Sequence, residues 1–115
     1  MGRRHRQREK LAAPDSDYLD GEGNVLTLRG SLSPASRGEY DNVRHGGLNR
    51  DDASQRALEF LFERLAVSWT IAGLRTSRQK ELLARYRMAS GDERQFIREA
   101  VRKHVEQNFP ELSAP

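Results

Sequence analysis

The sequence predicts a single, mainly α-helical domain of about four helices, with a short N-terminal β-hairpin packed on them. Three observations lead to this fold class. A glycine-rich segment between two apolar runs predicts a hairpin in residues 18–29. Helix-start signals occur at Ser33, Thr76 and Ser90. Apolar residues recur at helical spacing through residues 53–74, which predicts a central helix.

Residues 1–17 are predicted to form a flexible basic arm and linker, followed by one domain at residues 18–112. The first ten residues hold five basic side chains and one carboxylate, a net charge of +4, whereas the whole chain is formally +3. The rest of the chain therefore carries −1, so the basic character is confined to the arm. Its basic residues are Arg3, Arg4, Arg6, Arg8 and Lys10.

Capping signals predict the three other helices. A Ser-Pro pair opens a helix at residues 34–44, which ends before two glycines. A capping-box pattern at Thr76 and Gln79 predicts a helix that reaches about residue 88. The same pattern at Ser90 and Glu93 opens the last helix, which ends before the proline at position 110.

The predicted central helix has apolar side chains on two opposite faces. One face carries Leu58, Leu61, Phe62, Leu65, Trp69 and Ala72, and the other carries Phe60, Val67, Ile71 and Leu74. An ordinary surface helix has a single apolar stripe. This helix is therefore either the central core helix, or one of its stripes binds a partner protein or a second copy of the chain.

Several classes of function have no support in the residues. The chain has no cysteine, which excludes disulfides and zinc–thiolate sites and fits a reducing cytoplasm. The acidic run that starts at Asp15 fails the EF-hand spacing, and no catalytic or phosphate-loop motif occurs. His104 stands on an apolar stripe and is predicted to be a packed structural residue. We expect no enzymatic activity, no cofactor, no metal and no membrane span.

The basic arm supports an alternative function, in which a small nucleic-acid-binding protein uses its arginines to contact phosphates. Arg78, Lys80 and Arg85 on the helix after Thr76 would extend that surface. A helix-turn-helix around Gly73 is not indicated, because Trp69 occupies the position where a small residue packs in that motif.

Two stretches together resemble the tail assembly chaperones of long-tailed bacteriophages. They are Asn24-Val25-Leu26-Thr27-Leu28-Arg29 with Leu32-Ser33-Pro34, and Leu65-Ala66-Val67-Ser68-Trp69-Thr70-Ile71. The first is similar to the opening strand and first helix start of that family, and the second to its helix with a tryptophan signature. The chain departs from the family after the tryptophan, where residues 72–75 lack an acidic-glycine-proline stretch.

The resemblance implies a small helical protein of the infected host's cytoplasm that coats the tape-measure protein and assists the tail-tube subunits. It also implies that Trp69, Phe60, Val67 and Ile71 contact the partner. The function predicted from the sequence is therefore a non-enzymatic tail assembly chaperone or adaptor that binds apolar helical segments, with self-association through the same stripe as a variant.

Overall fold

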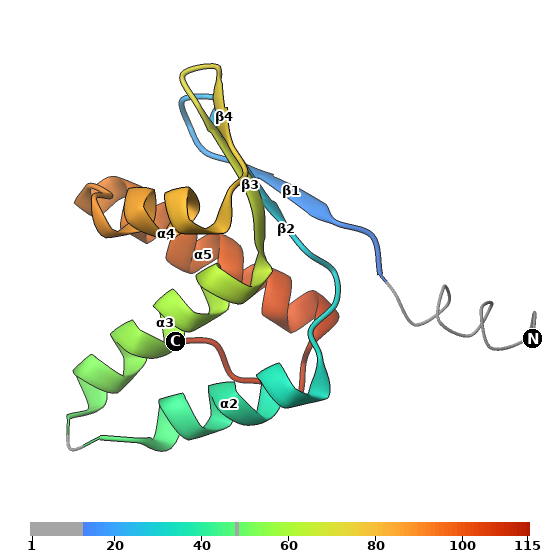
Figure 1. The fold of residues 1–115 in the computed structure, drawn as a ribbon, viewed down its shortest axis with the longest axis vertical. Coiled ribbons are helices and arrows are strands. Elements are labelled where there is room, and N and C mark those ends of the chain that lie inside the picture. The colour runs from blue at the N-terminus through green and yellow to red at the C-terminus, as the bar shows by residue number, and fades with distance from the viewer. Residues whose placement is uncertain (1–12, 48) are drawn as a thin grey trace, which may run out of the picture.

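The structure is a computed structural model that describes residues 13–47 and 49–115. These residues form a mixed α/β fold in which four helices pack on an antiparallel sheet of four strands (Figure 1). The fold class of the sequence analysis was therefore right in its helices and its N-terminal hairpin, and wrong in expecting no further strands. The elements in order are β1 (Ser16–Leu19), β2 (Val25–Leu28), α2 (Pro34–His45), α3 (Arg50–Leu65), β3 (Ala66–Ile71), β4 (Leu74–Thr76), α4 (Gln79–Arg87) and α5 (Gly91–Asn108).

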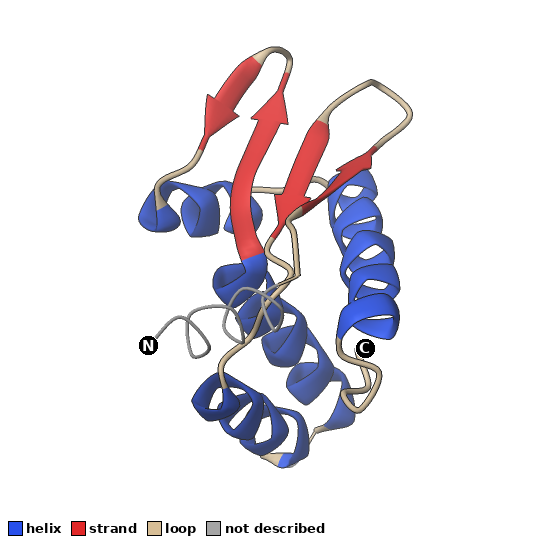
Figure 2. Cartoon of the chain, turned by 90° about the vertical axis from the view of Figure 1, so that its right-hand side faces the viewer, coloured by secondary structure: helices blue, strands red, loops and turns tan. Residues whose placement is uncertain are grey.

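The sheet has the strand order β1-β2-β3-β4, and every neighbouring pair is antiparallel. Helices α2 and α3 form the long connection between β2 and β3. These two strands pair so that Leu26 lies opposite Trp69. A register shift between Thr27 and Leu28 accommodates one extra residue of β3. Figure 2 shows the loops of both hairpins at the same end of the sheet, away from α2.

The predicted central helix at residues 53–74 is wrong in its second half. Helix α3 ends at Leu65, and the chain continues directly as β3. Valine, tryptophan, threonine and isoleucine favour a strand in residues 66–71. Ala72 (φ 51°) and Gly73 (φ 79°) then form a two-residue turn whose central residues both have positive φ. The residues of both predicted faces are therefore divided between a helix and a strand, and no two-faced helix forms.

Two of the three predicted helix starts form as expected. The Ser33 side chain accepts a hydrogen bond from the backbone of Ser36 at the start of α2. Ser90 and Glu93 form the predicted capping box of α5. Thr76 does not cap a helix, because it is the last residue of β4, and α4 begins at Gln79 without a side-chain cap. The second hairpin therefore places Thr76 in a strand, where it cannot cap a helix.

The core lies between the sheet and α3, α4 and α5. Its largest fully buried side chains are Trp69, Tyr40, Phe62, Phe109, Leu26, Leu28, Leu61, Leu65, Ile97, His104, Val101 and Val105. Strand β1 begins at Ser16, within the segment predicted as linker. Gly30 lies directly against the backbone of Ala13 and Pro14, where a Cβ atom would collide. The start of the described chain is therefore held beside the end of β2.

Candidate protein-binding groove

A groove of about 560 Å³ lies where the two hairpin loops meet the start of α5. Its apolar residues come from three elements: Leu19 ends β1, Ile71 ends β3 and Phe96 belongs to α5. Leu19 is 66% exposed, whereas Ile71 and Phe96 are partly buried against the core. The side-chain oxygen of Asn24 accepts a hydrogen bond from the backbone N–H of Ala72 at 3.0 Å. This bond joins the two hairpins and holds one wall of the groove in place.

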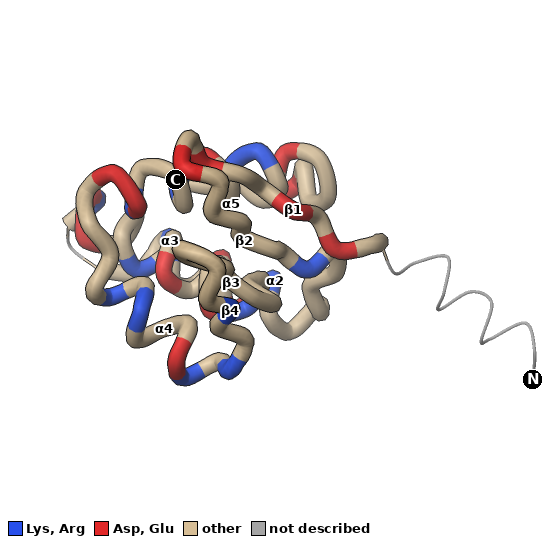
Figure 3. Tube along the Cα trace, turned by 90° about the horizontal axis from the view of Figure 1, so that it is seen from above, with Lys and Arg blue, Asp and Glu red and all other residues tan. Residues whose placement is uncertain are grey.

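Every charged residue that lines the groove is acidic. These residues are Asp20, Glu22, Asp92, Glu93 and Glu99. Figure 3 shows β1 and α4 on opposite sides of the molecule, with acidic positions along β1 and mainly Lys and Arg positions along α4. The groove therefore combines an apolar surface with an acidic rim, and Arg85 of the basic helix reaches that rim at Glu93.

Hydrogen bonds keep two of the rim carboxylates ionised. Burial acts to raise the pKa of the Asp20 carboxyl, but hydrogen bonds from the Asn24 side chain and from the backbone of the turn outweigh it and lower the pKa. Burial likewise opposes the ionisation of Glu93, and bonds from the Ser90 backbone and the Arg85 guanidinium lower its pKa overall. Both groups are negatively charged at neutral pH.

The other three rim carboxylates have few partners among the described residues. Within the described part of the chain, Glu22, Asp92 and Glu99 make no ion pair. Glu99 accepts only a hydrogen bond from the Gln95 side chain, at 2.9 Å. A cationic side chain placed in the groove would meet these three charges without first breaking an ion pair to a described residue.

Of the four residues predicted to contact a partner, only Ile71 lies in this groove. Trp69 is 1% exposed and packs edge to face on Phe62, with ring centroids 5.9 Å apart. Phe60 lines a different cleft, of about 400 Å³, between α2 and α3, where Arg64 stacks on its ring at 5.0 Å. Val67 lines a third cleft. The four residues therefore do not form one contact surface, because they do not share one helix.

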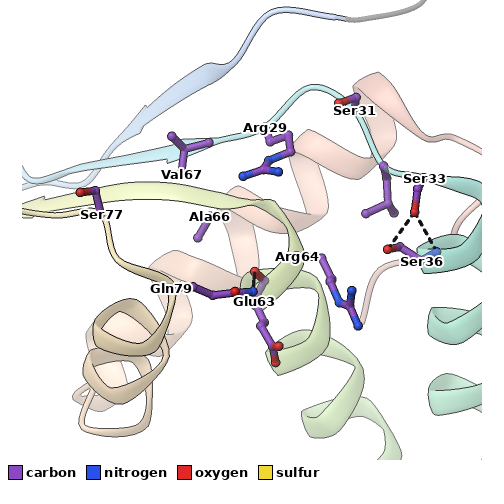
Figure 4. Close-up of a pocket in the computed structure, with 11 residues that line it drawn as sticks. Arg29, Ser31, Ser33, Ser36, Glu63, Arg64, Ala66, Val67, Ser77 and Gln79 are labelled. Atoms are coloured by element: carbon purple, nitrogen blue, oxygen red, sulfur yellow. Dashed lines mark hydrogen bonds between the residues drawn. The ribbon is translucent and has the colours of Figure 1, made fainter.

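The cleft that contains Val67 is polar and has a volume of about 430 Å³ (Figure 4). It is lined by side chains from the end of β2, the start of α2, the end of α3 and the residues before α4, among them Arg29, Ser31, Ser33, Ser36, Glu63, Arg64, Ser77 and Gln79. Arg64 pairs with Glu39 at 3.0 Å, and its Nε atom is buried without a hydrogen bond to any described residue. Arg29 makes no ion pair among the residues described. This cleft is the better candidate for an anion.

The residues predicted to bind nucleic acid divide into three groups. Arg3, Arg4, Arg6, Arg8 and Lys10 lie outside the described residues. Arg78 and Lys80 are exposed beside the polar cleft. Arg85 pairs with Glu93, and its guanidinium lies 5.2 Å from the centre of the Trp69 ring. Arg85 is therefore part of the packing of α4 on the sheet rather than a free basic side chain.

His104 packs inside the protein, as the sequence predicted. Its Nδ1 atom is 2.8 Å from the Tyr18 hydroxyl, and its Nε2 atom is 2.8 Å from the Arg29 carbonyl oxygen. A carbonyl can only accept, so Nε2 carries the proton and Nδ1 accepts from Tyr18. Within residues 13–47 and 49–115, no group of three or more His, Asp or Glu side chains could hold a metal ion. No helix in those residues is long and apolar enough to cross a membrane.

Comparison with known proteins gives no match: no family model, no curated protein and no solved structure is similar to this chain. The groove residues that the sequence analysis missed are Leu19, Phe96 and the rim carboxylates. The acidic run that starts at Asp15 was considered only as a calcium loop, whereas its Asp20 and Glu22 lie on the rim of the groove. Its partners at residues 71 and 92–99 are distant in sequence, so no local motif joins them.

Proposed function

We propose that this chain is a non-enzymatic binding protein, an assembly chaperone or adaptor of phage tail type, that holds an apolar and basic segment of a partner protein. The observation that carries the proposal is the groove, in which Leu19, Ile71 and Phe96 are surrounded by five carboxylates. A tape-measure or tail-tube protein is the partner that the family resemblance favours. The proposal needs no cofactor and no catalytic residue.

The chemistry of the groove defines the segment that fits it. Burial of its apolar surface would contribute about 25 cal/mol per Å², before the cost of ordering the partner. The carboxylates would select Lys or Arg beside the apolar side chains, and would act more on association rate and orientation than on affinity. An amphipathic helix with basic flanks meets both requirements.

A fluorescently labelled synthetic helix of about 18 residues, with leucine on one face and lysine on the other, tests the groove directly. We expect Ile71→Asp to weaken its binding by about tenfold, because the new carboxylate removes apolar contact at the centre. Val67→Asp is the matched control, since it places the same charge on the same strand but in another cleft. Equal losses in the two variants, at equal stability by circular dichroism, would contradict the site.

Self-association is a variant of the same proposal, in which a second copy supplies the segment. Light scattering of the full chain at low and high salt measures it directly. An oligomer that Ile71→Asp dissociates and Val67→Asp does not would make the groove an interface between copies. If the parent protein and both variants are monomers, the segment that binds the groove must come from a different protein.

The polar cleft favours nucleic-acid binding as a second candidate function. Arg29 points into that cleft, and Arg75, Arg78 and Lys80 lie exposed on the segment that borders it. These side chains and the arm would contact phosphates, so affinity for a labelled DNA duplex should fall steeply with salt. Deletion of residues 1–10 should abolish this binding, whereas the groove should still bind the synthetic helix. DNA affinity that survives both the deletion and high salt would exclude phosphate contact as its basis.

A further inference from the structure

We propose that residues 1–12 of the chain occupy the acidic groove of the same molecule. The evidence for this docking is the opposite charge of the arm and the groove, together with the length of the arm. The consequence of docking, that the arm competes with a partner segment, rests on the proposed function.

Charge complementarity selects the arm as occupant. The arm holds five cationic side chains against one carboxylate, whereas the rest of the chain has a net charge of −1. The attraction is therefore local, and the groove is a site whose charged lining is entirely acidic. Its rim already accepts one guanidinium, since Arg85 pairs with Glu93. Glu22, Asp92 and Glu99 remain for the arginines of the arm.

The arm is also long enough to reach the groove of its own chain. It joins the described chain at Ala13, beside Gly30, and β1 runs from there to Leu19 at the groove. The six steps from Ala13 to Leu19 cover about 20 Å of extended strand. Twelve extended residues span about 40 Å, so the arm can turn back along the sheet and place its basic residues on the rim.

Disulfide trapping in the full chain tests the docking, and the absence of native cysteine leaves one possible pair in each double variant. Gln7→Cys is combined with Gln95→Cys, which is exposed in the groove. The control combines Gln7→Cys with Gln107→Cys, which is exposed near the other end of α5. That end carries His104, which bonds to Arg29 next to the arm's attachment point. An undocked arm would thus meet the control position more often.

We expect the groove pair to oxidise about fivefold faster than the control pair, as an intrachain product, because docking raises the local concentration of the two thiols. The preference should disappear at about 0.5 M NaCl, where exposed charges are screened. It should also disappear in Glu22→Gln/Glu99→Gln and persist in Asp51→Asn/Glu81→Gln, which removes the same charge elsewhere. Faster oxidation of the control pair, or a disulfide-linked dimer as the main product, would overturn the proposal; the dimer would identify a second copy's arm as the occupant.

The synthetic leucine–lysine helix separates this inference from the proposed function. The oxidised groove pair should bind the helix about tenfold more weakly than the same protein after reduction. If the arm is trapped in the groove but the reduced protein binds no helix, the proposed function fails and the docking stands. If the helix binds and the arm shows no preference for the groove, the docking fails and the proposed function stands.

Discussion

The indole of Trp69 lies between the ring of Phe62 and the guanidinium of Arg85, both about 5 to 6 Å from its centre. Its Nε1 atom is buried and has no hydrogen-bond partner among the described residues. An aromatic ring in this position contributes through burial and packing, and its polar N–H group opposes that contribution. The residue that the sequence analysis placed at a partner surface is therefore a core residue of the described chain.

Substitutions at Trp69 should separate these two effects. We expect Trp69→Ala to lower the free energy of unfolding by about 3–5 kcal/mol, because it leaves a large cavity. Trp69→Phe should cost clearly less, about 1–2 kcal/mol, because it keeps an aromatic ring and removes the unpaired N–H group. Urea unfolding followed by circular dichroism measures both. A Trp69→Ala protein with the stability of the parent would contradict the burial of this side chain.

His104 makes stability depend on pH near neutrality. Burial lowers the pKa of the His104 imidazole, and the hydrogen bond to the Arg29 carbonyl and the charge of Asp15 offset this only in part. The unfolded chain therefore binds a proton at a higher pH than the folded chain does. Unfolding should become easier as pH falls below the ordinary histidine value of about 6.5.

This pH effect should be visible between about pH 7.5 and 5.5, above the range in which Asp and Glu titrate. We expect the urea midpoint to fall across that interval in the parent protein and to change much less in His104→Gln. His45→Gln is the matched control, because that side chain is exposed and bonds only within its own helix turn. A parent midpoint that is constant, or that rises as pH falls, would contradict the buried neutral imidazole.

The hairpin of β3 and β4 depends on a turn with two left-handed residues. Ala72 adopts φ 51° and Gly73 adopts φ 79°. An L-residue with a side chain costs about 1 kcal/mol in this region, whereas glycine and asparagine tolerate it. Ala72 therefore destabilises the turn, whereas Gly73 adopts its conformation without strain. The turn also places Ile71 and Leu74 opposite each other at the end of the hairpin.

We expect Gly73→Ala to lower the free energy of unfolding by about 1 kcal/mol. Ala72→Asn should raise it by about 0.5–1 kcal/mol, since Asn-Gly is the preferred pair for such a turn. Gly21→Ala is the control, because a Cβ there meets open space and its φ is not in the left-handed region. Thermal unfolding gives the order of the four proteins, and a Gly21→Ala loss equal to that of Gly73→Ala would refute the turn assignment.

At the scale of the molecule, side chains join segments from both ends of the described chain. Tyr18 bonds to His104, the Tyr40 hydroxyl donates to the Ser113 carbonyl, and Arg37 pairs with Glu111. One hydrophobic core also contains side chains from β2, β3 and helices α2 to α5. Such cross-connections make one cooperative unit rather than two subdomains.

We expect a single unfolding transition, with coincident curves from tryptophan fluorescence and far-ultraviolet circular dichroism. Deletion of residues 111–115 should lower the free energy of unfolding by about 1–3 kcal/mol, because it leaves the buried Tyr40 hydroxyl without its acceptor. Glu111→Gln should cost less than about 0.5 kcal/mol, since its ion pair is exposed. Two separated transitions would show that the hairpins and helices unfold independently.

Local signals by themselves determined much of this fold. The glycine-rich turn after Asp20 specified the first hairpin, and Ser33 and the Ser90–Glu93 pair specified the starts of α2 and α5. The placement of His104 in the core also followed from the apolar spacing of its own helix. The turn and the caps depend on hydrogen bonds among residues close in sequence, and the apolar spacing around His104 marks the buried face of its helix, so the chain pattern contains the necessary information.

Only the tertiary structure decided the state of residues 66–76. Their apolar spacing continued that of α3, while their side chains also favoured a strand. Pairing with β2 decided between the two, because Leu26 and Thr27 pair with Trp69 and Ser68 across the sheet. The groove arose from the same long-range pairing, which brings the ends of β1 and β3 together beside α5. Contacts between segments more than forty residues apart carry no periodic signal, so the sequence alone could not reveal the site.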